Sequence, residues 1–151
     1  MSDPLETQAL SLATRDVLET MFFIEVLSET DEPPQGSPGT LEARLRFAGE
    51  RSGEFRIWLT AEAARSIATN FLGLDDENAI RDSQVGEVAA ELANIICGSA
   101  LSRLSCDRAF DLSHPEVGPP ADDARTWSDA ASRTFDLGNG WLTTILRFEH
   151  A

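Results

Sequence analysis

The chain has 151 residues, of which 42% are hydrophobic, and a formal net charge of −14 at pH 7. This length is typical of one domain with its own core, so we expect a single domain over residues 1–151. The acidic balance argues against nucleic acid and anionic membranes as partners, because both are bound through lysine and arginine, whereas it suits a partner that presents a basic patch.

Targeting signals and membrane spans are not expected. The first residues, MSDPLETQAL, lack a basic region followed by a hydrophobic one. No apolar run approaches the roughly 18 residues of a membrane span. Cys97 and Cys106 fall in or near one helical stretch, too far apart along it to form a disulfide, which agrees with a reducing compartment. We therefore expect a soluble, cytoplasmic protein.

The first expected element is a helix that Asp3 caps, with Pro4 in its first turn and Glu6 completing a capping box. Its apolar residues recur at helical spacing and are expected to lie on a sheet: Leu10, Ala13, Val17 and Met21. Residues 22–27 are rich in β-branched and aromatic side chains and predict a strand. A loop rich in proline and glycine is expected at residues 28–39.

A β-hairpin and a second helix follow. Apolar and charged side chains alternate at residues 41–47 and again at 54–59, with a turn between them at 49–53. This pattern predicts a hairpin with one face in water. Thr60 can cap the next helix, and Gly73 can end it. Its inward residues are expected to be Ala64, Ile67, Ala68 and Phe71.

The longest helical pattern covers residues 81–105. One side is apolar and is expected to be buried: Val85, Val88, Leu92, Ile95, Ile96 and Ser99. A different side carries Glu87, Glu91, Asn94 and Gly98 at i, i+4, i+7 and i+11. Small side chains flank this polar face, so another surface can approach it closely: Ala90, Ala93 and Cys97.

The rest of the chain predicts further antiparallel strands. Residues 107–112 suggest a strand, and residues 114–130, which contain three prolines, suggest a loop. A terminal hairpin is predicted from residues 134–137 and 141–148, joined by the turn Gly138-Asn139-Gly140. The expected fold class is therefore α+β, an antiparallel β-sheet with long helices packed on it.

Most sites that have a sequence signature are excluded. His114 and His150 are the only histidines, and neither lies at metal-ligand spacing from another ligand. The three acids at residues 75–77 precede a helix, where they suit its positive end better than a metal. The chain has no glycine-rich phosphate loop and no GxSxG elbow. These absences argue against a metal, nucleotide or Ser-His-Asp site.

The polar helix face remains, and its chemistry centres on Glu91 and Asn94, which are i and i+3 neighbours. A carboxylate can pair with a lysine from a partner, and a carboxamide donates and accepts hydrogen bonds without titrating. The pair is a poor nucleophile, but it can hold a water in line with an electrophile that a partner activates. Gly98 leaves the approach open. Taken alone, the pattern fits a plain solvated helix face better.

The run VGEVAAELANIICGSA at residues 85–100 resembles the signature of the CheC/CheX/FliY family of chemotaxis phosphatases. Glu91, Asn94 and Gly98 match that signature, whereas Glu87 occupies a position at which the family has Asp or Ser. The order of the other expected elements is also similar over nearly the whole chain. With one signature helix rather than two, the sequence looks most like CheX, and the resemblance implies a CheX-like fold.

The resemblance implies a phosphatase that hydrolyses the aspartyl phosphate of a CheY-like response regulator. Glu91 would bind the active-site lysine of the regulator, and Asn94 would orient the attacking water, while Glu87 and Gly98 would contact the partner. It implies no cofactor for this chain, because the regulator would bind the Mg²⁺. CheX relatives pair as homodimers through their sheets, and the terminal hairpin is a suitable edge for such pairing.

Two other interpretations stay open. The chain can be a non-catalytic CheX-like binding module that docks on a receiver domain or a flagellar motor component, or an unrelated soluble α+β domain. The presence of Asn94 favours the enzyme, because a degenerate module does not need the carboxamide. The family often has a proline roughly two dozen residues after this Asn, and here Pro115 and Pro119 bracket that spacing.

Overall fold

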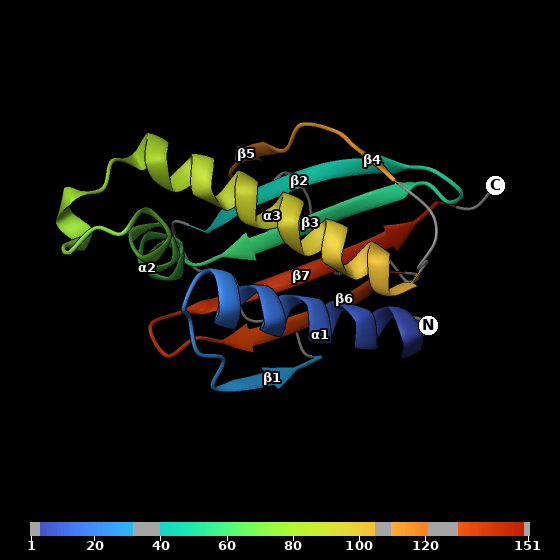
Figure 1. Cartoon of the computed structure of the whole chain (residues 1–151), viewed down its shortest axis with the longest axis horizontal. Coiled ribbons are helices and arrows are strands. Elements are labelled where there is room, and N and C mark those ends of the chain that lie inside the picture. Colours follow the sequence, from blue (N-terminus) through green and yellow to red (C-terminus); the bar gives the residue numbers. More distant parts are fainter. Residues whose placement is uncertain (1–3, 32–39, 105–109, 121–129, 150–151) are drawn as a thin grey trace.

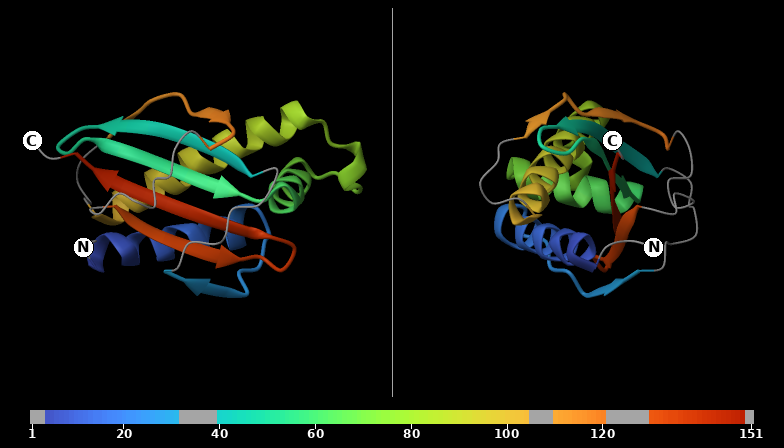
Figure 2. Two further views of the ribbon diagram at one scale, coloured as in Figure 1. Left: turned by 180° about the vertical axis from the view of Figure 1, so that it is seen from behind. Right: turned by 90° about the vertical axis from the view of Figure 1, so that its right-hand side faces the viewer.

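The structure is a computed structural model that describes residues 4–31, 40–104, 110–120 and 130–149. It is an α+β fold, as expected, in which two long helices cover one face of a seven-stranded sheet (Figure 1). Figure 2 shows the sheet from its other face, with both helices behind it. The elements in chain order are α1 (Pro4–Met21), β1 (Ser28–Thr30), β2 (Leu41–Ala48), β3 (Gly53–Leu59), α2 (Ala61–Leu72), a 3₁₀ turn η1 (Glu77–Ala79), α3 (Asp82–Leu104), β4 (Asp111–Leu112), β5 (Glu116–Gly118), β6 (Ala131–Asp136) and β7 (Trp141–Phe148).

The strands pair antiparallel in the order β1-β6-β7-β3-β2-β4, and β5 also pairs with β2. The predicted hairpins β2–β3 and β6–β7 are both present, although β6 begins earlier than the sequence suggests. The expectation that the terminal hairpin forms a sheet edge is wrong. β7 lies at the centre of the sheet between β6 and β3, and β1 covers the outer side of β6.

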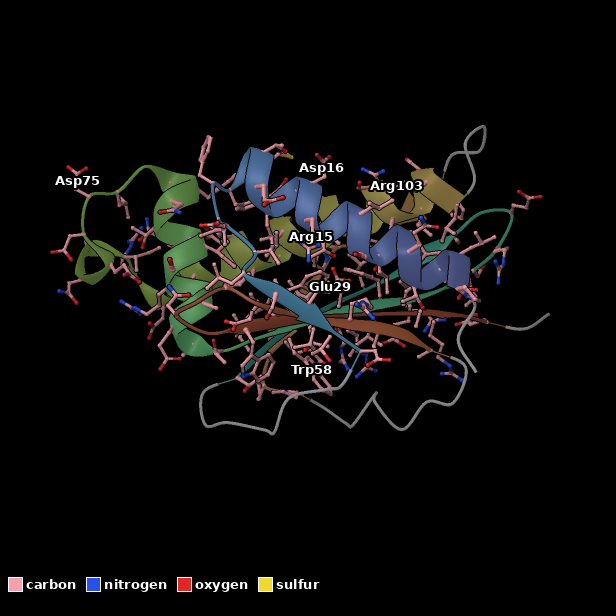
Figure 3. All side chains as sticks on the ribbon, turned by 90° about the horizontal axis from the view of Figure 1, so that it is seen from below. Arg15, Asp16, Glu29, Trp58, Asp75 and Arg103 are labelled. Carbon is pink, nitrogen blue, oxygen red and sulfur yellow. The ribbon has the colours of Figure 1, made fainter. Side chains whose placement is uncertain are left out.

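The core lies between the helices and the inner face of the sheet. Residues of α1, α3 and the inner sheet face that are fully buried include Leu10, Leu92, Ile96, Phe55, Ile57 and Leu142. Each such side chain contributes about 1.5–3 kcal/mol through removal of its apolar surface from water. Asp16 on α1 and Arg103 on α3 form an ion pair at 3.7 Å, which joins the two helices at their exposed side (Figure 3).

Local side chains set the start of α3. The backbone N–H of Arg81 donates to Oε1 of Gln84 at 2.8 Å, which is one half of a capping box. Arg65 on α2 pairs with Asp82 at 3.2 Å and so fixes this end against α2. The predicted last residue, Ser105, lies outside the described residues. By length and composition α3 passes for a membrane span, but half of that window is buried inside the fold, as in the core helix of a soluble protein.

Helix α2 confirms its predicted caps. Oγ1 of Thr60 accepts a hydrogen bond from the N–H of Ala63 at 3.3 Å, and Gly73 adopts the left-handed conformation, with φ of 69°, at the other end. Phe71 was expected to point inward but is 41% exposed, although its ring stacks on the buried ring of Phe22, with centroids 4.9 Å apart. Met21 at the end of α1 is likewise 45% exposed rather than buried.

The predicted strand at residues 22–27 is wrong. The segment buries alternate side chains, but it is not assigned to a strand, and Phe23 has a positive φ of 57°. The N–H of Leu27 donates to the carbonyl of Asp136, and regular pairing with β6 begins only at Ser28. The strand β1 therefore falls in the stretch that was expected to be a loop.

The second face of the β2–β3 hairpin is open to water only in part: Arg46 is exposed, as expected, but the end of the face around Glu42 is buried. Glu42, Arg56 and Trp58 are all less than 7% exposed. An Arg56 Nη1 to Glu42 Oε1 bond of 3.1 Å and a Trp58 Nε1 to Glu42 Oε1 bond of 2.9 Å satisfy the buried carboxylate. The alternation of apolar and charged residues in the sequence correctly assigned side chains to the two faces of the hairpin. The polarity of Glu42 and Arg56 did not reveal that these two residues are buried and pair with each other.

Candidate functional site

The four residues predicted for the site lie together on one side of α3. Glu87 and Glu91 are exposed, while Asn94 and Gly98 are half-buried. Of the residues predicted for the opposite apolar side, Val85, Val88, Leu92 and Ile96 are buried, whereas Ile95 and Ser99 are only half-buried. The helical periodicity therefore placed the polar face correctly.

The small side chains expected to flank this face divide between two environments. Ala90 is half-buried beside the polar residues, whereas Ala93 and Cys97 are fully buried and belong to the core. Burial raises the pKa of the Cys97 thiol to about 12. A thiol in this environment stays protonated at neutral pH, so it is not a nucleophile for this site.

A groove of about 550 Å³ runs along the polar face of α3. Its second wall is the connection between β4 and β5. These two short strands pair one after the other along the same edge of β2. The lining residues are Glu87, Ala90, Glu91, Asn94, Leu112, Ser113, His114 and Pro115. Gly98 lies one turn beyond the groove, and a Cβ placed there meets no atom within 4 Å.

The sequence analysis did not identify this second wall. It assigned residues 107–112 to a strand and residues 114–130 to a loop. The strand β4 covers Asp111–Leu112, residues 107–109 lie outside the described residues, and β5 lies inside the predicted loop. Of the two prolines that bracket the family spacing, Pro115 lines the groove and Pro119 does not. The feature that defines this wall is the pairing of β5 with β2, a strand some seventy residues earlier in the chain. A pattern of neighbouring residues does not reveal a contact at that distance along the sequence.

The polar side chains that α3 contributes to the groove are available to a partner. Among the described residues, the side chains of Glu87, Glu91 and Asn94 have no hydrogen bond or ion pair with the rest of the chain. The carboxylates of Glu87 and Glu91 lie on successive turns and favour a cation. The carboxamide of Asn94, one turn further along, can both donate and accept hydrogen bonds. The described part of the chain contains no group of three or more His, Cys, Asp or Glu that could hold a metal.

A larger hollow of about 790 Å³ lies between α1, β1 and β6, and two of its charged lining residues, Glu29 and Arg133, are paired with each other. Glu29 on β1 accepts hydrogen bonds from Ser11, Arg15 and Arg133 at 2.7–2.8 Å. In Figure 3, Arg15 and Glu29 lie together between α1 and β1. Burial by itself raises the pKa of Glu29, but these hydrogen bonds and the charge of Arg133 lower it overall. The cluster fastens β1 to α1 and β6, and it engages the carboxylate of Glu29 fully within the fold.

Comparison with known proteins gives one family. The family described as "Chemotaxis phosphatase CheX" matches residues 42–131. This match includes β2, β3, α2, the whole of α3 and the β4–β5 wall of the groove. A comparison with curated protein sequences finds no match.

Solved structures share the fold at low sequence identity. A chemotaxis protein CheX from Desulfovibrio desulfuricans has a TM-score of 0.73 and 20% identity, with 95% of this chain and 99% of that chain covered. CheX in a CheX–CheY–BeF₃–Mg²⁺ complex from Borrelia burgdorferi has a TM-score of 0.70 and 20% identity, covering 95% and 97%. A CheC-like superfamily protein from Shewanella has a TM-score of 0.74 and 19% identity, covering 98% and 99%.

Proposed function

Because this chain belongs to the CheX family of chemotaxis phosphatases, we propose that it hydrolyses the aspartyl phosphate of a CheY-like response regulator. The observation that carries the proposal is the groove beside α3, where Glu91 and Asn94 have no partner within the described chain. The CheX relative from Borrelia burgdorferi forms a complex with CheY, BeF₃ and Mg²⁺, which supports a receiver domain as the partner.

In the proposed reaction, a water oxygen attacks phosphorus while the bond to the aspartyl oxygen breaks. The products are inorganic phosphate and the free carboxylate of the regulator. The carboxamide of Asn94 accepts a hydrogen bond from the attacking water and holds it in line with the breaking bond. The contribution of Asn94 is orientation, since a carboxamide neither titrates nor forms a covalent intermediate at neutral pH.

Glu91 has a docking role in this proposal. Its exposed carboxylate forms an ion pair with the active-site lysine of the regulator, which fixes Asn94 relative to the phosphoryl group. Glu87 lies one turn before Glu91 and adds negative charge to the same contact, with a longer side chain than the family's Asp or Ser. Gly98 allows the partner to approach the helix closely. The Mg²⁺ of the reaction is held by the regulator, so this chain supplies no cofactor.

The test is a phosphate-release assay with phosphorylated receivers of the same organism. We expect wild-type protein to accelerate phosphate loss from a cognate receiver and Asn94→Ala to lose that acceleration, by at least about 100-fold, with binding largely retained. Asn78→Ala is the matched control, because Asn78 is an exposed asparagine on η1, outside the groove. Undiminished activity of Asn94→Ala would refute the mechanism.

Glu91→Ala tests the docking contact separately. Loss of the ion pair should raise KM more than it lowers kcat, and Glu19→Ala on the exposed side of α1 is the control for loss of one carboxylate. If a receiver binds the wild-type protein but its phosphate loss is not accelerated, the protein is a non-catalytic binding module instead.

We also propose that the protein acts in the cytoplasm as a homodimer. The sheet offers two edges for pairing, β1 on one side and the β4 and β5 side on the other. Sedimentation equilibrium gives the test: a mass of twice 16.5 kDa supports the dimer, and a mass of one chain at all concentrations contradicts it.

A further inference from the structure

The second wall of the groove is a rigid arch formed by residues 112–116, which we call the β4–β5 arch. Both of its ends pair with β2. Near its middle, the N–H of Ser113 donates to the carbonyl of Arg46 at 2.8 Å, and Oγ of Ser113 accepts from the N–H of Arg46 at 2.9 Å. The hydroxyl of Ser113 is therefore engaged by β2, and the arch is held at a fixed position opposite α3.

His114 stands at the centre of this arch. Its side chain is exposed and lines the groove beside α3 as well as a second hollow of about 410 Å³ on the β2 side. The following residue is Pro115, which restricts the backbone of His114 to extended conformations. Among the described residues, His114 has no hydrogen bond or ion pair. A polar ring on a backbone that is held in place, with no bond to the other described residues, is available to a partner.

The charged groups near His114 on the β2 side are paired with one another. Arg44 contacts Glu116 at 3.2 Å, and Arg46 contacts Glu54 at 3.9 Å and also pairs with Glu149. These pairs leave neither arginine as a free cation for a partner in the groove. His114 is thus the side chain of the arch that lines the groove, carries a hydrogen-bond donor and has no bond of its own to the other described residues.

The two walls of the groove are complementary in charge to a site that carries both signs. Glu87 and Glu91 on α3 favour a cation, while His114 on the arch favours an anion, because imidazole donates at least one N–H in either protonation state. We propose that His114 is a specificity residue that donates a hydrogen bond to an anionic oxygen of the docked receiver, either on the phosphoryl group or on a carboxylate beside it. This inference rests on the proposed function.

The experiment compares His114→Ala, His114→Gln and the control Asp111→Ala in the phosphate-release assay, with KM and kcat determined separately. Asp111 is an exposed residue of β4 that does not line the groove. We expect His114→Ala to raise KM about tenfold with kcat unchanged, and His114→Gln, which keeps a donor, to recover most of the loss. Asp111→Ala should leave both parameters as in the wild type.

Binding to the phosphorylated and the unphosphorylated receiver distinguishes the two sources of the anionic oxygen. Weaker binding of His114→Ala to the phosphorylated form alone identifies the phosphoryl group, and equal weakening for both forms identifies a carboxylate. Unchanged KM and unchanged binding in His114→Ala overturn the inference even when the wild-type protein is active. If the wild type accelerates phosphate loss from no receiver, the proposed function fails. The inference about His114 is then overturned as well if His114→Ala binds a receiver as tightly as the wild type does, or if the wild type binds no receiver.

Discussion

Replacing Gly98 with alanine should make the free protein more stable and its proposed reaction less efficient. Gly98 lies well inside α3, where glycine is about 0.8–1 kcal/mol less favourable than alanine. A Cβ at this position meets no atom within 4 Å, so the new methyl group strains nothing in the free protein. We expect the free energy of unfolding to rise by about 0.5–1 kcal/mol, which raises the Tm by about 1–4 °C.

The same methyl group would stand where the receiver approaches the helix. Overfilling a closely packed contact typically costs about 1–3 kcal/mol, which corresponds to a rise of about 5- to 150-fold in KM. Thermal unfolding followed by circular dichroism measures the first effect, and steady-state phosphate release measures the second. The opposite signs of the two effects are the diagnostic result.

Gly86→Ala is the matched control, because it makes the same substitution in the same helix about 120° around its axis. A Cβ at Gly86 comes 3.7 Å from Cγ1 of Val117, an ordinary van der Waals contact. We expect Gly86→Ala to gain similar stability and to keep full activity. Wild-type KM in Gly98→Ala would refute the close-approach role of Gly98, and an equal KM rise in both variants would assign the effect to a stiffer helix.

Three further predictions concern stability and reactivity. Leu92→Ala should lower the free energy of unfolding by about 2–5 kcal/mol in urea titrations, because Leu92 is fully buried between α3 and the rest of the core. Cys97 should react with iodoacetamide only after unfolding, as mass spectrometry of its peptide would show, because burial raises its pKa to about 12. The pKa of Glu29 is lowered in the fold, so its stabilising contribution is present above its ordinary value of 4.5 and is lost as pH falls through the lower folded value. Glu29→Gln should therefore reduce stability at neutral pH and flatten the acid limb of the stability profile; an unchanged acid limb would contradict this origin.

The elements that local chemistry defines were predictable from the sequence. The alternation in β2 and β3, the Thr60 and Gly73 caps of α2 and the helical periodicity of α3 each depend on neighbours within a few residues. For the same reason, the side of α3 that carries Glu91 and Asn94 followed from periodicity alone.

The features that depend on distant pairing were not predictable. Residues 22–27 have the composition of a strand, but among the described residues regular pairing with β6 begins only at Ser28, and Phe23 has a positive φ. The buried Glu42 and Arg56 look like solvent-exposed residues of an amphipathic strand until their ion pair is seen. The β4–β5 arch contains Pro115 and joins two short strands, and its pairing with β2 gives it a fixed place.

The contrast between local patterns and distant pairing explains why only one of the two walls of the groove was predictable from the sequence. Periodicity gives one wall, a helix face with free carboxylates and a carboxamide, and this wall alone is hard to tell from a solvated surface. The second wall turns the face into a groove, and it also restricts which side of α3 a partner can reach. Because the carboxamide of Asn94 cannot act as a nucleophile, the role proposed for the groove is to position a water against an electrophile that a partner activates. The phosphorylated receiver proposed above supplies such an electrophile.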